Sequence, residues 1–166
     1  MNTAFLITGS NIGDRAANLQ EALRLIKASG CNVIATSQIY ETEAWGVSNQ
    51  DAYYNQTLKI KTEMSAALLI TTLLQIETVM GRIRKEKYSA RNIDIDILFF
   101  NNDIINEKNL IIPHPRIQDR KFVLTPMAEL APLFIHPILK KTIKKLLMMS
   151  QDPLEAKPLQ QKYNCE

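Results

Sequence analysis

Two aspartates with strand spacing are the residues most suited to chemistry in this sequence. Asp94 and Asp96 lie in the stretch RNIDIDILFF, residues 91–100, where isoleucines occupy the alternate positions. On a strand, side chains two residues apart point the same way and lie about 6.6 Å apart. Two carboxylates at that distance repel each other unless cations lie beside them, and such hard oxygen ligands suit magnesium held together with substrate phosphates. The pair predicts a magnesium site; the alternative is that both aspartates face solvent on an edge strand.

A cationic segment lies directly before this strand. The stretch GRIRKEKYSAR places Arg82, Arg84, Lys85, Lys87 and Arg91 between an expected helix and the aspartates. A charged run of this kind is usually solvated, but here its guanidinium groups are placed to bind the phosphates that a metal also holds. The two segments together predict a clamp for the polyphosphate of ATP.

Glu77 falls on the last turn of the expected helix, where the helix dipole disfavours a carboxylate. This placement predicts a partner such as Arg84 or a ligand, and a plain surface glutamate is the alternative. The stretch PHPRIQDRKF adds His114, Arg116, Arg120 and Phe122 as a second cationic segment.

Asn55 follows two tyrosines, Tyr53 and Tyr54, in a strand-like segment. A side-chain amide between aromatic rings is able to bind the hydrogen-bonding edge of a flat heterocycle. The alternative is that the tyrosines belong to the core. No GxxxxGK[ST] or GxGxxG motif occurs in the chain, so a nucleotide is expected to be held in another way.

Composition predicts one domain around one core. The 166 residues are 46% hydrophobic and 22% charged, which predicts a single domain over residues 1–150 and a polar, weakly ordered tail over 151–166. The net charge of +3 argues against binding duplex nucleic acid. No signal peptide or membrane-spanning run is recognised, so we expect a cytoplasmic protein with no membrane partner. Cys31 and Cys165 show no metal or disulfide spacing and receive no role.

The expected elements follow hydrophobic periodicity. Strands are predicted over residues 3–8, 31–42, 53–62 and 91–100, and helices over 14–29 and 65–80. A hairpin-like extension over 103–112, a short helix near 123–130 and an amphipathic segment over 139–149 with a solvated basic face follow. This order predicts an α+β fold, the ferredoxin-like split βαβ (βαββαβ) with a C-terminal helical extension. In that arrangement the helices cover one face of the sheet and leave the other available.

Four segments of the sequence together resemble the hydroxymethyldihydropterin pyrophosphokinase family of folate biosynthesis. They are GSNIGDR, YETEAWG with YYNQTLKI, GRIRKEKYSARNIDIDILFF, and IIPHPRIQDRKFVLTPMAEL. The resemblance covers roughly residues 5 to 132. It implies a ferredoxin-like enzyme that transfers a pyrophosphoryl group from ATP to the hydroxymethyl group of 6-hydroxymethyl-7,8-dihydropterin, releasing AMP.

The resemblance also implies roles for individual residues. Asp94 and Asp96 resemble the pair that binds two Mg²⁺ ions, and Arg82 and Arg91 resemble mobile arginines that serve the transferring phosphates. The remaining matches fall into a nucleotide set, Glu77, Arg84, Ile97, His114 and Arg120, and a pterin set, Thr42, Trp45, Tyr53, Asn55 and Phe122. The expected partners are the small-molecule substrates ATP and reduced hydroxymethylpterin, bound by a monomer.

The sequence departs from the family pattern at a few positions. Ser89 and Ala90 stand where Gly-Pro is frequent, Glu43 and Ala44 where prolines are frequent, and Asn109 and Ile111 where polar or basic residues occur in some members. These departures bear on ATP affinity and loop kinetics and leave the reaction class unchanged.

Two other functions are compatible with parts of the pattern. A D-x-D pair alone is able to hold the metal and diphosphate of a sugar-nucleotide transferase. A ferredoxin-like RNA-binding module is a non-enzymatic alternative, and it displays aromatic side chains on its sheet face, where this chain places aspartates.

Overall fold

A computed structural model of the chain describes residues 1–44, 51–81 and 91–159. The first part of the fold contains β1 (Asn2–Ser10), α1 (Arg15–Ala28), β2 (Asn32–Thr36), β3 (Tyr40–Thr42), β4 (Tyr53–Thr62), α2 (Ala66–Val79) and β5 (Asp94–Phe100). It is followed by β6 (Ile105–Glu107), β7 (Leu110–Ile112), the 3-10 helix η1 (Ile117–Asp119), α3 (Lys121–Leu130), α4 (Ile143–Met149) and β8 (Lys157–Pro158).

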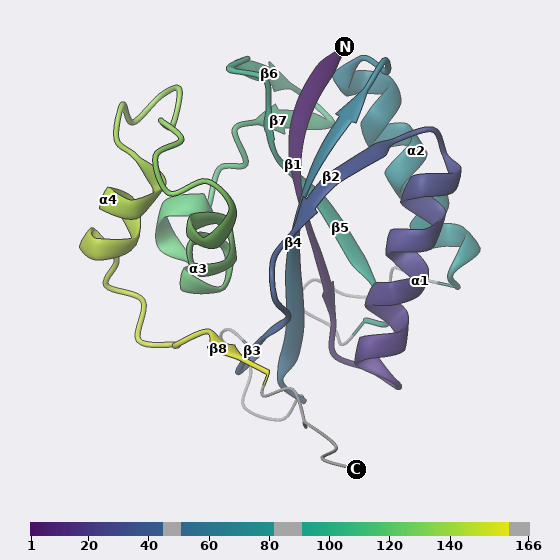
Figure 1. The fold of residues 1–166 in the computed structure, drawn as a ribbon, viewed down its shortest axis with the longest axis horizontal. Coiled ribbons are helices and arrows are strands. Elements are labelled where there is room, and N and C mark those ends of the chain that lie inside the picture. Colours follow the sequence, from purple (N-terminus) through teal and green to yellow (C-terminus); the bar gives the residue numbers. More distant parts are fainter. Residues whose placement is uncertain (45–50, 82–90, 160–166) are drawn as a thin grey trace.

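One antiparallel sheet forms the centre of the molecule (Figure 1). Its strand order in the described residues is β5-β1-β4-β3-β8, and β2 also pairs with β4. β1 is bonded along both edges, to β4 and to β5. β6 and β7 form the small hairpin predicted beside it. The order of elements confirms the predicted ferredoxin-like split βαβ arrangement.

The helices α1 and α2 begin and end where their sequences predict. Asp14 and Ser65 each accept a hydrogen bond from the backbone N–H three residues further on, which caps the first turn. Gly30 and Gly81 follow the helices with φ of +95° and +83°, a conformation that glycine adopts without strain. Both helices bury one apolar stripe against the sheet, through residues that include Leu19, Ala22, Ile26, Leu69, Leu73 and Ile76.

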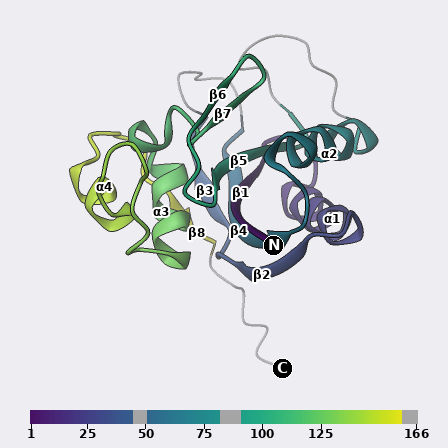
Figure 2. The ribbon, with the colours of Figure 1, turned by 90° about the horizontal axis from the view of Figure 1, so that it is seen from above.

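The second face of the sheet is not left available, contrary to our expectation. α3 and α4 pack against it, and Figures 1 and 2 show the sheet between these helices and the α1–α2 layer. The reason is that β1 and β5 are apolar on both faces. Phe5 and Ile7 of β1, with Leu98 and Phe99 of β5, form a second core with α3 and α4, whereas Leu6 lies in the first core under α1 and α2. The helical extension therefore completes the sandwich.

Two expected elements are divided or shortened. The predicted strand over 31–42 is two strands, β2 and β3, which pair with successive parts of β4. Between them the Ser37 hydroxyl accepts a hydrogen bond from the Thr57 N–H, so a side chain replaces a backbone partner where the chain bends. The predicted amphipathic segment over 139–149 is helical only from Ile143, because Lys140 has a φ of +56° and Thr142 caps the helix. Its lysines are exposed, as predicted.

The first nine residues of the expected tail, 151–159, make contacts with other elements of the fold, and the weak order expected of the whole tail stays a prediction. Asp152 is buried, and β8 pairs with β3. A short polar segment is held here by hydrogen bonds to other elements and does not need an apolar stripe of its own. The proposed boundary of the domain at residue 150 stays a prediction.

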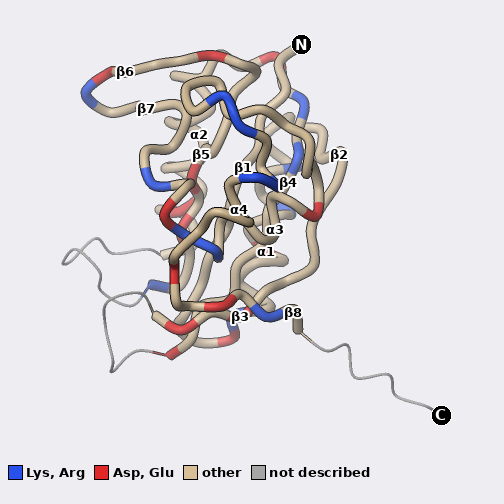
Figure 3. Tube along the Cα trace, turned by 90° about the vertical axis from the view of Figure 1, so that its left-hand side faces the viewer, with Lys and Arg blue, Asp and Glu red and all other residues tan. Residues whose placement is uncertain are grey.

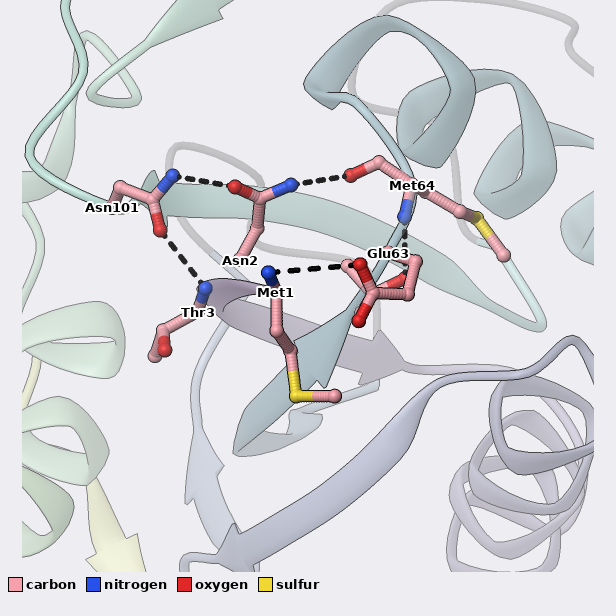
Figure 4. A network of polar contacts seen from close by, with 7 residues as sticks. Met1, Asn2, Thr3, Glu63, Met64 and Asn101 are labelled. Carbon is pink, nitrogen blue, oxygen red and sulfur yellow. Dashed lines mark hydrogen bonds and ion pairs between the residues drawn. The ribbon is translucent and has the colours of Figure 1, made fainter.

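At one end of the sheet a polar network ties the first strand to its neighbours (Figure 4). The Asn2 side chain donates to the Met64 carbonyl at 2.9 Å and accepts from the Asn101 side chain at 2.9 Å. Asn101 also accepts from the Thr3 N–H at 2.9 Å. Because this network holds β1 between β4 and β5, the register of all three strands is fixed at the end far from Asp94.

None of the helices in residues 1–44, 51–81 and 91–159 is long and apolar enough to cross a bilayer. On the side that carries α3 and α4, basic and acidic segments are interspersed (Figure 3).

His136 makes the stability of the C-terminal extension sensitive to acid. Its imidazole is buried, lies edge-on to Phe99 with ring centroids 5.5 Å apart, and accepts hydrogen bonds through Nδ1 from the Ile138 and Leu139 N–H groups at 3.2 and 3.1 Å. Burial lowers the pKa of His136 below its ordinary value. Its stabilisation is therefore complete above the unfolded-state pKa of about 6.5 and is lost as the pH falls through the lower folded-state pKa.

We expect the melting temperature to fall more between pH 7.5 and pH 5.0 in the wild type than in His136→Asn. The asparagine side chain offers an acceptor in place of Nδ1 and does not titrate, although it loses the ring contact. Thermal denaturation monitored by circular dichroism measures both proteins. Equal pH slopes in the two proteins would contradict the assignment.

Candidate active site

Asp94 and Asp96 open the strand β5 and face the side of the sheet that carries α3. Asp94 pairs with Gly9 and Asp96 with Ile7, whose side chain belongs to the second core. Ile95 and Ile97 point the other way into the first core. Both carboxylates are half-buried at the border of the second core. The alternation predicted from the sequence is therefore present.

Gly9 lies between Asp94 and Asn55 in one row across the sheet. It pairs with Asp94 on β5 and with Asn55 on β4, and paired residues present their side chains to the same face. Two strand spacings separate Asp94 from Asn55, roughly 10 Å. A Cβ atom on Gly9 would lie 2.6 Å from the Asn55 Oδ1, so only glycine leaves room for this amide. The row places a carboxylate and an amide at opposite sides of one glycine.

Two polar side chains on the Asn55 side of this row have no hydrogen-bond partner among the described residues. The Asn55 side chain is buried and makes no hydrogen bond within residues 1–44, 51–81 and 91–159. The Thr42 Oγ1 is buried and has no hydrogen-bond partner in the described structure either. Thr42 pairs with Tyr53, the half-buried first residue of β4. Buried polar groups without partners are uncommon in folded proteins, and a bound ligand is one way to satisfy them.

Arg91 lies directly beside the carboxylates. Its Nη1 is 3.1 Å from the Asp94 Oδ2. Its backbone is clamped by Asn11, which accepts from the Arg91 N–H through Oδ1 at 2.8 Å and donates its own N–H to the Arg91 carbonyl at 3.1 Å. Asn11, in the turn after β1, thus holds in place the arginine whose positive charge lies beside Asp94. The sequence pattern predicts no role for Asn11. The only feature that marks this residue in the sequence is its polar side chain within the GSNIGDR segment.

Glu77 is buried at the end of α2 and bonds to β5. Its Oε1 accepts a hydrogen bond from the Ile95 N–H at 2.8 Å, which lies between the two aspartates in the chain. The expected polar partner thus includes a backbone amide, and the solvent-exposed alternative is wrong because the side chain is only 3% exposed. Glu77 fixes the helix to the strand that carries the carboxylates.

The segment after β7 places His114, Arg120 and Phe122 near the site. The His114 N–H donates to the Leu98 carbonyl at 3.0 Å, and its Nδ1 accepts from the Arg116 N–H at 3.2 Å. Burial, followed by the positive charge of Arg120, lowers the pKa of His114 to about 4, and the negative charge of Asp94 acts in the opposite direction. His114 is therefore neutral at pH 7, with its proton on Nε2. The Arg120 guanidinium lies 5.6 Å from the centre of the Phe122 ring.

The remaining predicted residues differ in their placement. The Ile97 side chain is buried in the first core and does not share the face of the aspartates. Trp45, Arg82 and Arg84 lie outside the described residues. No group of three or more histidine, cysteine or acidic side chains suited to a metal occurs in the described part of the chain.

The fold and the carboxylate–arginine arrangement are compatible with the class of proteins that bind and transfer phosphoryl groups. A sequence profile of the 7,8-dihydro-6-hydroxymethylpterin-pyrophosphokinase family matches residues 5–132. The chain belongs to this family.

Two bacterial relatives agree with the family match over most of their length. A protein of Methylorubrum extorquens is 40% identical over 133 residues, which are 80% of this chain and 84% of the relative. A protein of Bacillus subtilis is 40% identical over 130 residues, 78% of each chain. Both are named 2-amino-4-hydroxy-6-hydroxymethyldihydropteridine pyrophosphokinase.

Solved structures agree in fold. Wild-type HPPK-DHPS of Plasmodium falciparum superposes with a TM-score of 0.71 at 20% identity, over 89% of this chain and 44% of that one. Another HPPK-DHPS, solved in complex with substrates, gives 0.72 at 17% identity over 89% and 43%. This chain thus spans less than half the length of those proteins.

Glu77 offers a test of how the carboxylate strand is held. We expect Glu77→Ala to lower the free energy of unfolding by about 1 to 3 kcal/mol, because it leaves the buried Ile95 N–H without this acceptor. Glu77→Gln keeps an acceptor oxygen and should lose clearly less. Urea denaturation of both variants measures the difference. Equal losses in the two variants would show that the hydrogen bond to Ile95 does not determine the effect.

Proposed function

We propose that this chain transfers the pyrophosphoryl group of ATP to the hydroxymethyl group of 6-hydroxymethyl-7,8-dihydropterin, giving AMP and the pterin diphosphate of folate biosynthesis. The observation that carries the proposal is the row in which Gly9 separates Asp94 from the buried Asn55 amide. It provides an anionic, metal-binding side and a hydrogen-bonding side for a flat ring. The family match and the names of the relatives support the same reaction. They give no support to a sugar-nucleotide transferase or an RNA-binding module.

The residues present fit magnesium. Asp94 and Asp96 are half-buried hard ligands on one face, and no third acidic, histidine or cysteine ligand joins them in the described structure. Mg²⁺ is typically held by one or two carboxylates with substrate phosphates and water completing its octahedron, so this donor set suits it. We propose that the two aspartates hold two ions with ATP. When bound, Mg²⁺ supplies charge neutralisation and lowers the pKa of the attacking hydroxyl.

The residues beside the carboxylates are suited to pyrophosphoryl transfer. In such a reaction the main demands are positioning the two substrates in line and stabilising charge on the transferring group. Asn11 holds Arg91 next to Asp94. There the Arg91 guanidinium is placed to stabilise the negative charge of bound phosphates. Arg82 is proposed for the same task and lies outside the described residues.

The pterin side is assigned to Thr42, Tyr53, Asn55 and Phe122, with Trp45 outside the described residues. The buried Asn55 amide and the Thr42 hydroxyl provide hydrogen bonds for the edge of the ring. Tyr53 and Phe122 are half-buried aromatic side chains suited to stacking on its faces.

The nucleotide side is assigned to His114 and Arg120, with Arg84 outside the described residues. The neutral His114 imidazole donates through Nε2, and its pKa of about 4 makes it too weak a base to remove the pterin hydroxyl proton at pH 7. Glu77 and Ile97, both buried, are proposed to serve this side by fixing the strand whose backbone borders the nucleotide. Action as a monomer in the cytoplasm is part of the same proposal.

A product assay tests the reaction directly. With ATP, Mg²⁺ and the reduced hydroxymethylpterin, we expect mass spectrometry to detect AMP and pterin diphosphate in equal amounts. Asp94→Asn and Asp96→Asn should lower turnover by on the order of a hundredfold or more, because each removes a metal-binding charge.

Asp103→Asn is the matched control, since Asp103 is exposed in the turn after the same strand. Its turnover should match that of the wild type. Near wild-type turnover of either site variant at ordinary Mg²⁺ concentration would refute the metal assignment, and release of ADP in place of AMP would refute the reaction.

Asn55 tests the pterin pocket. We expect Asn55→Ala to weaken pterin binding by about 1 to 3 kcal/mol and to leave ATP binding nearly unchanged, as measured by calorimetry. Gly9→Ala should weaken pterin binding through the same amide, because its Cβ would displace Asn55 Oδ1. In the double variant with Gly9→Ala and Asn55→Ala, the second substitution should therefore weaken pterin binding little beyond the effect of the first. Weakened ATP binding with unchanged pterin binding would show that the two substrates are placed on the wrong sides.

A further inference from the structure

The segment 151–159, which we call the C-terminal strap, connects two elements of the proposed pterin pocket. It follows α4, passes α3 and pairs with β3 through β8, as Figure 1 shows along the lower edge of the fold. The strap lies beyond residues 5–132, the part of the chain that the family profile matches. Its contacts therefore concern a part of this chain to which the family match assigns no role.

One end of the strap caps α3. The Asp152 Oδ2 accepts a hydrogen bond from the Lys121 N–H, the first residue of α3, at 3.0 Å across 31 positions of sequence. Arg120, the residue before the helix, makes no side-chain capping bond in the described structure. A carboxylate at this end of a helix satisfies an N–H group and interacts favourably with the helix dipole. Asp152 thus supplies from a distance the cap that the local sequence lacks.

Asp152 is itself held in one orientation. Its carboxylate is buried, and its Oδ1 accepts from the Leu154 N–H at 3.0 Å. Its N–H donates to the Ser150 Oγ at 3.3 Å. A second contact between the strap and the helix joins Lys121 Nζ to Glu155. The strap therefore fixes the first turn of α3 at two points.

The other end of the strap is bonded to β3. Lys157 and Pro158 pair with Glu41 and Tyr40, and the Leu159 N–H donates to the Ile39 carbonyl at 2.9 Å. β3 ends at Thr42, and the first turn of α3 contains Phe122, directly after Lys121. The strap thus spans the two elements that carry Thr42 and Phe122.

We propose that Asp152 is a positioning residue for the pterin pocket: by capping α3, it holds Phe122 at the distance from Thr42 that the pterin ring requires. The proposal rests on the pocket assigned above. Asp152 acts through the Lys121 N–H and does not itself touch substrate. Without the cap, the first turn of α3 is free to unwind, and part of the pterin binding energy is then used to order it.

The test compares two cap removals in the full-length chain. Asp152→Ala should raise the pterin Kd by about tenfold, the effect of losing a helix cap. Thr142→Ala is the matched control, because the Thr142 Oγ1 caps α4 by accepting from the Lys145 N–H at 3.1 Å, on a helix that carries no assigned pocket residue. It should lower the melting temperature comparably and leave the pterin Kd unchanged. Calorimetry at a temperature at which both variants are folded gives the Kd values.

Two further variants make the outcome decisive. Asp152→Asn keeps one acceptor oxygen for two N–H groups, so it should raise the pterin Kd by about two- to threefold; it carries the test if Asp152→Ala does not fold. Phe122→Ala should weaken pterin binding strongly. If it does so while the Asp152 variants bind pterin like the wild type, the strap is only structural and this proposal is overturned. If Phe122→Ala has no effect, the pocket assignment and this proposal fail together.

Discussion

The double pairing of β1 is the constraint on which the site depends. Because β1 is bonded to β4 along one edge and to β5 along the other, the residues opposite Gly9 on both neighbours are fixed relative to each other by backbone hydrogen bonds. Asp94 and Asn55 therefore keep their separation without any direct contact. The polar network around Asn2 and Asn101 secures the same strands at the far end of the sheet. Preorganisation of this kind suits the two sides of the proposed site.

α3 links the second face of the sheet to the site. Its Glu129 carboxylate accepts from the Tyr40 hydroxyl at 2.7 Å and from the Gln38 N–H at 3.1 Å, so the end of the helix is bonded to the β3 region while its start is capped by the strap. Burial, aided by Glu129, raises the pKa of Tyr40 to about 12, which keeps the hydroxyl protonated and donating. The apolar contacts of Phe5, Ile7 and Phe99 hold the middle of the same helical layer. The position of α3 is thus determined both by core packing and by polar contacts.

Local sequence patterns were sufficient for the elements whose periodicity is strong. The spacing of Asp94 and Asp96 against Ile95 and Ile97 predicted which side each faces, and the capping residues Asp14 and Ser65 marked the starts of α1 and α2. What the sequence did not reveal depends on distant partners. Asn11 acquires a role only because Arg91 folds beside it, and the strap is ordered by bonds to α3 and β3 and not by its own composition. The covered second face does not follow from local patterns, because the helices after residue 112 reach it only through packing against distant residues of β1 and β5.

A β-bulge in β5 separates the part of the strand that carries the aspartates from the part that carries the phenylalanines. Leu6 pairs with Ile97 and Phe5 with Phe99, so Leu98 is an extra residue, and its carbonyl accepts the His114 N–H. The bulge turns Phe99 toward the second core and Phe100 toward the first. Loss of Leu98 would remove the bulge and leave Phe99 and Phe100 on their present faces by simple alternation, with Asp94 and Asp96 still in register with β1. The second core would lose the Leu98 side chain, and the His114 N–H would lose its acceptor. A change of chain length at this point would thus alter the second core and the position of His114 without moving the end of the strand that carries the aspartates.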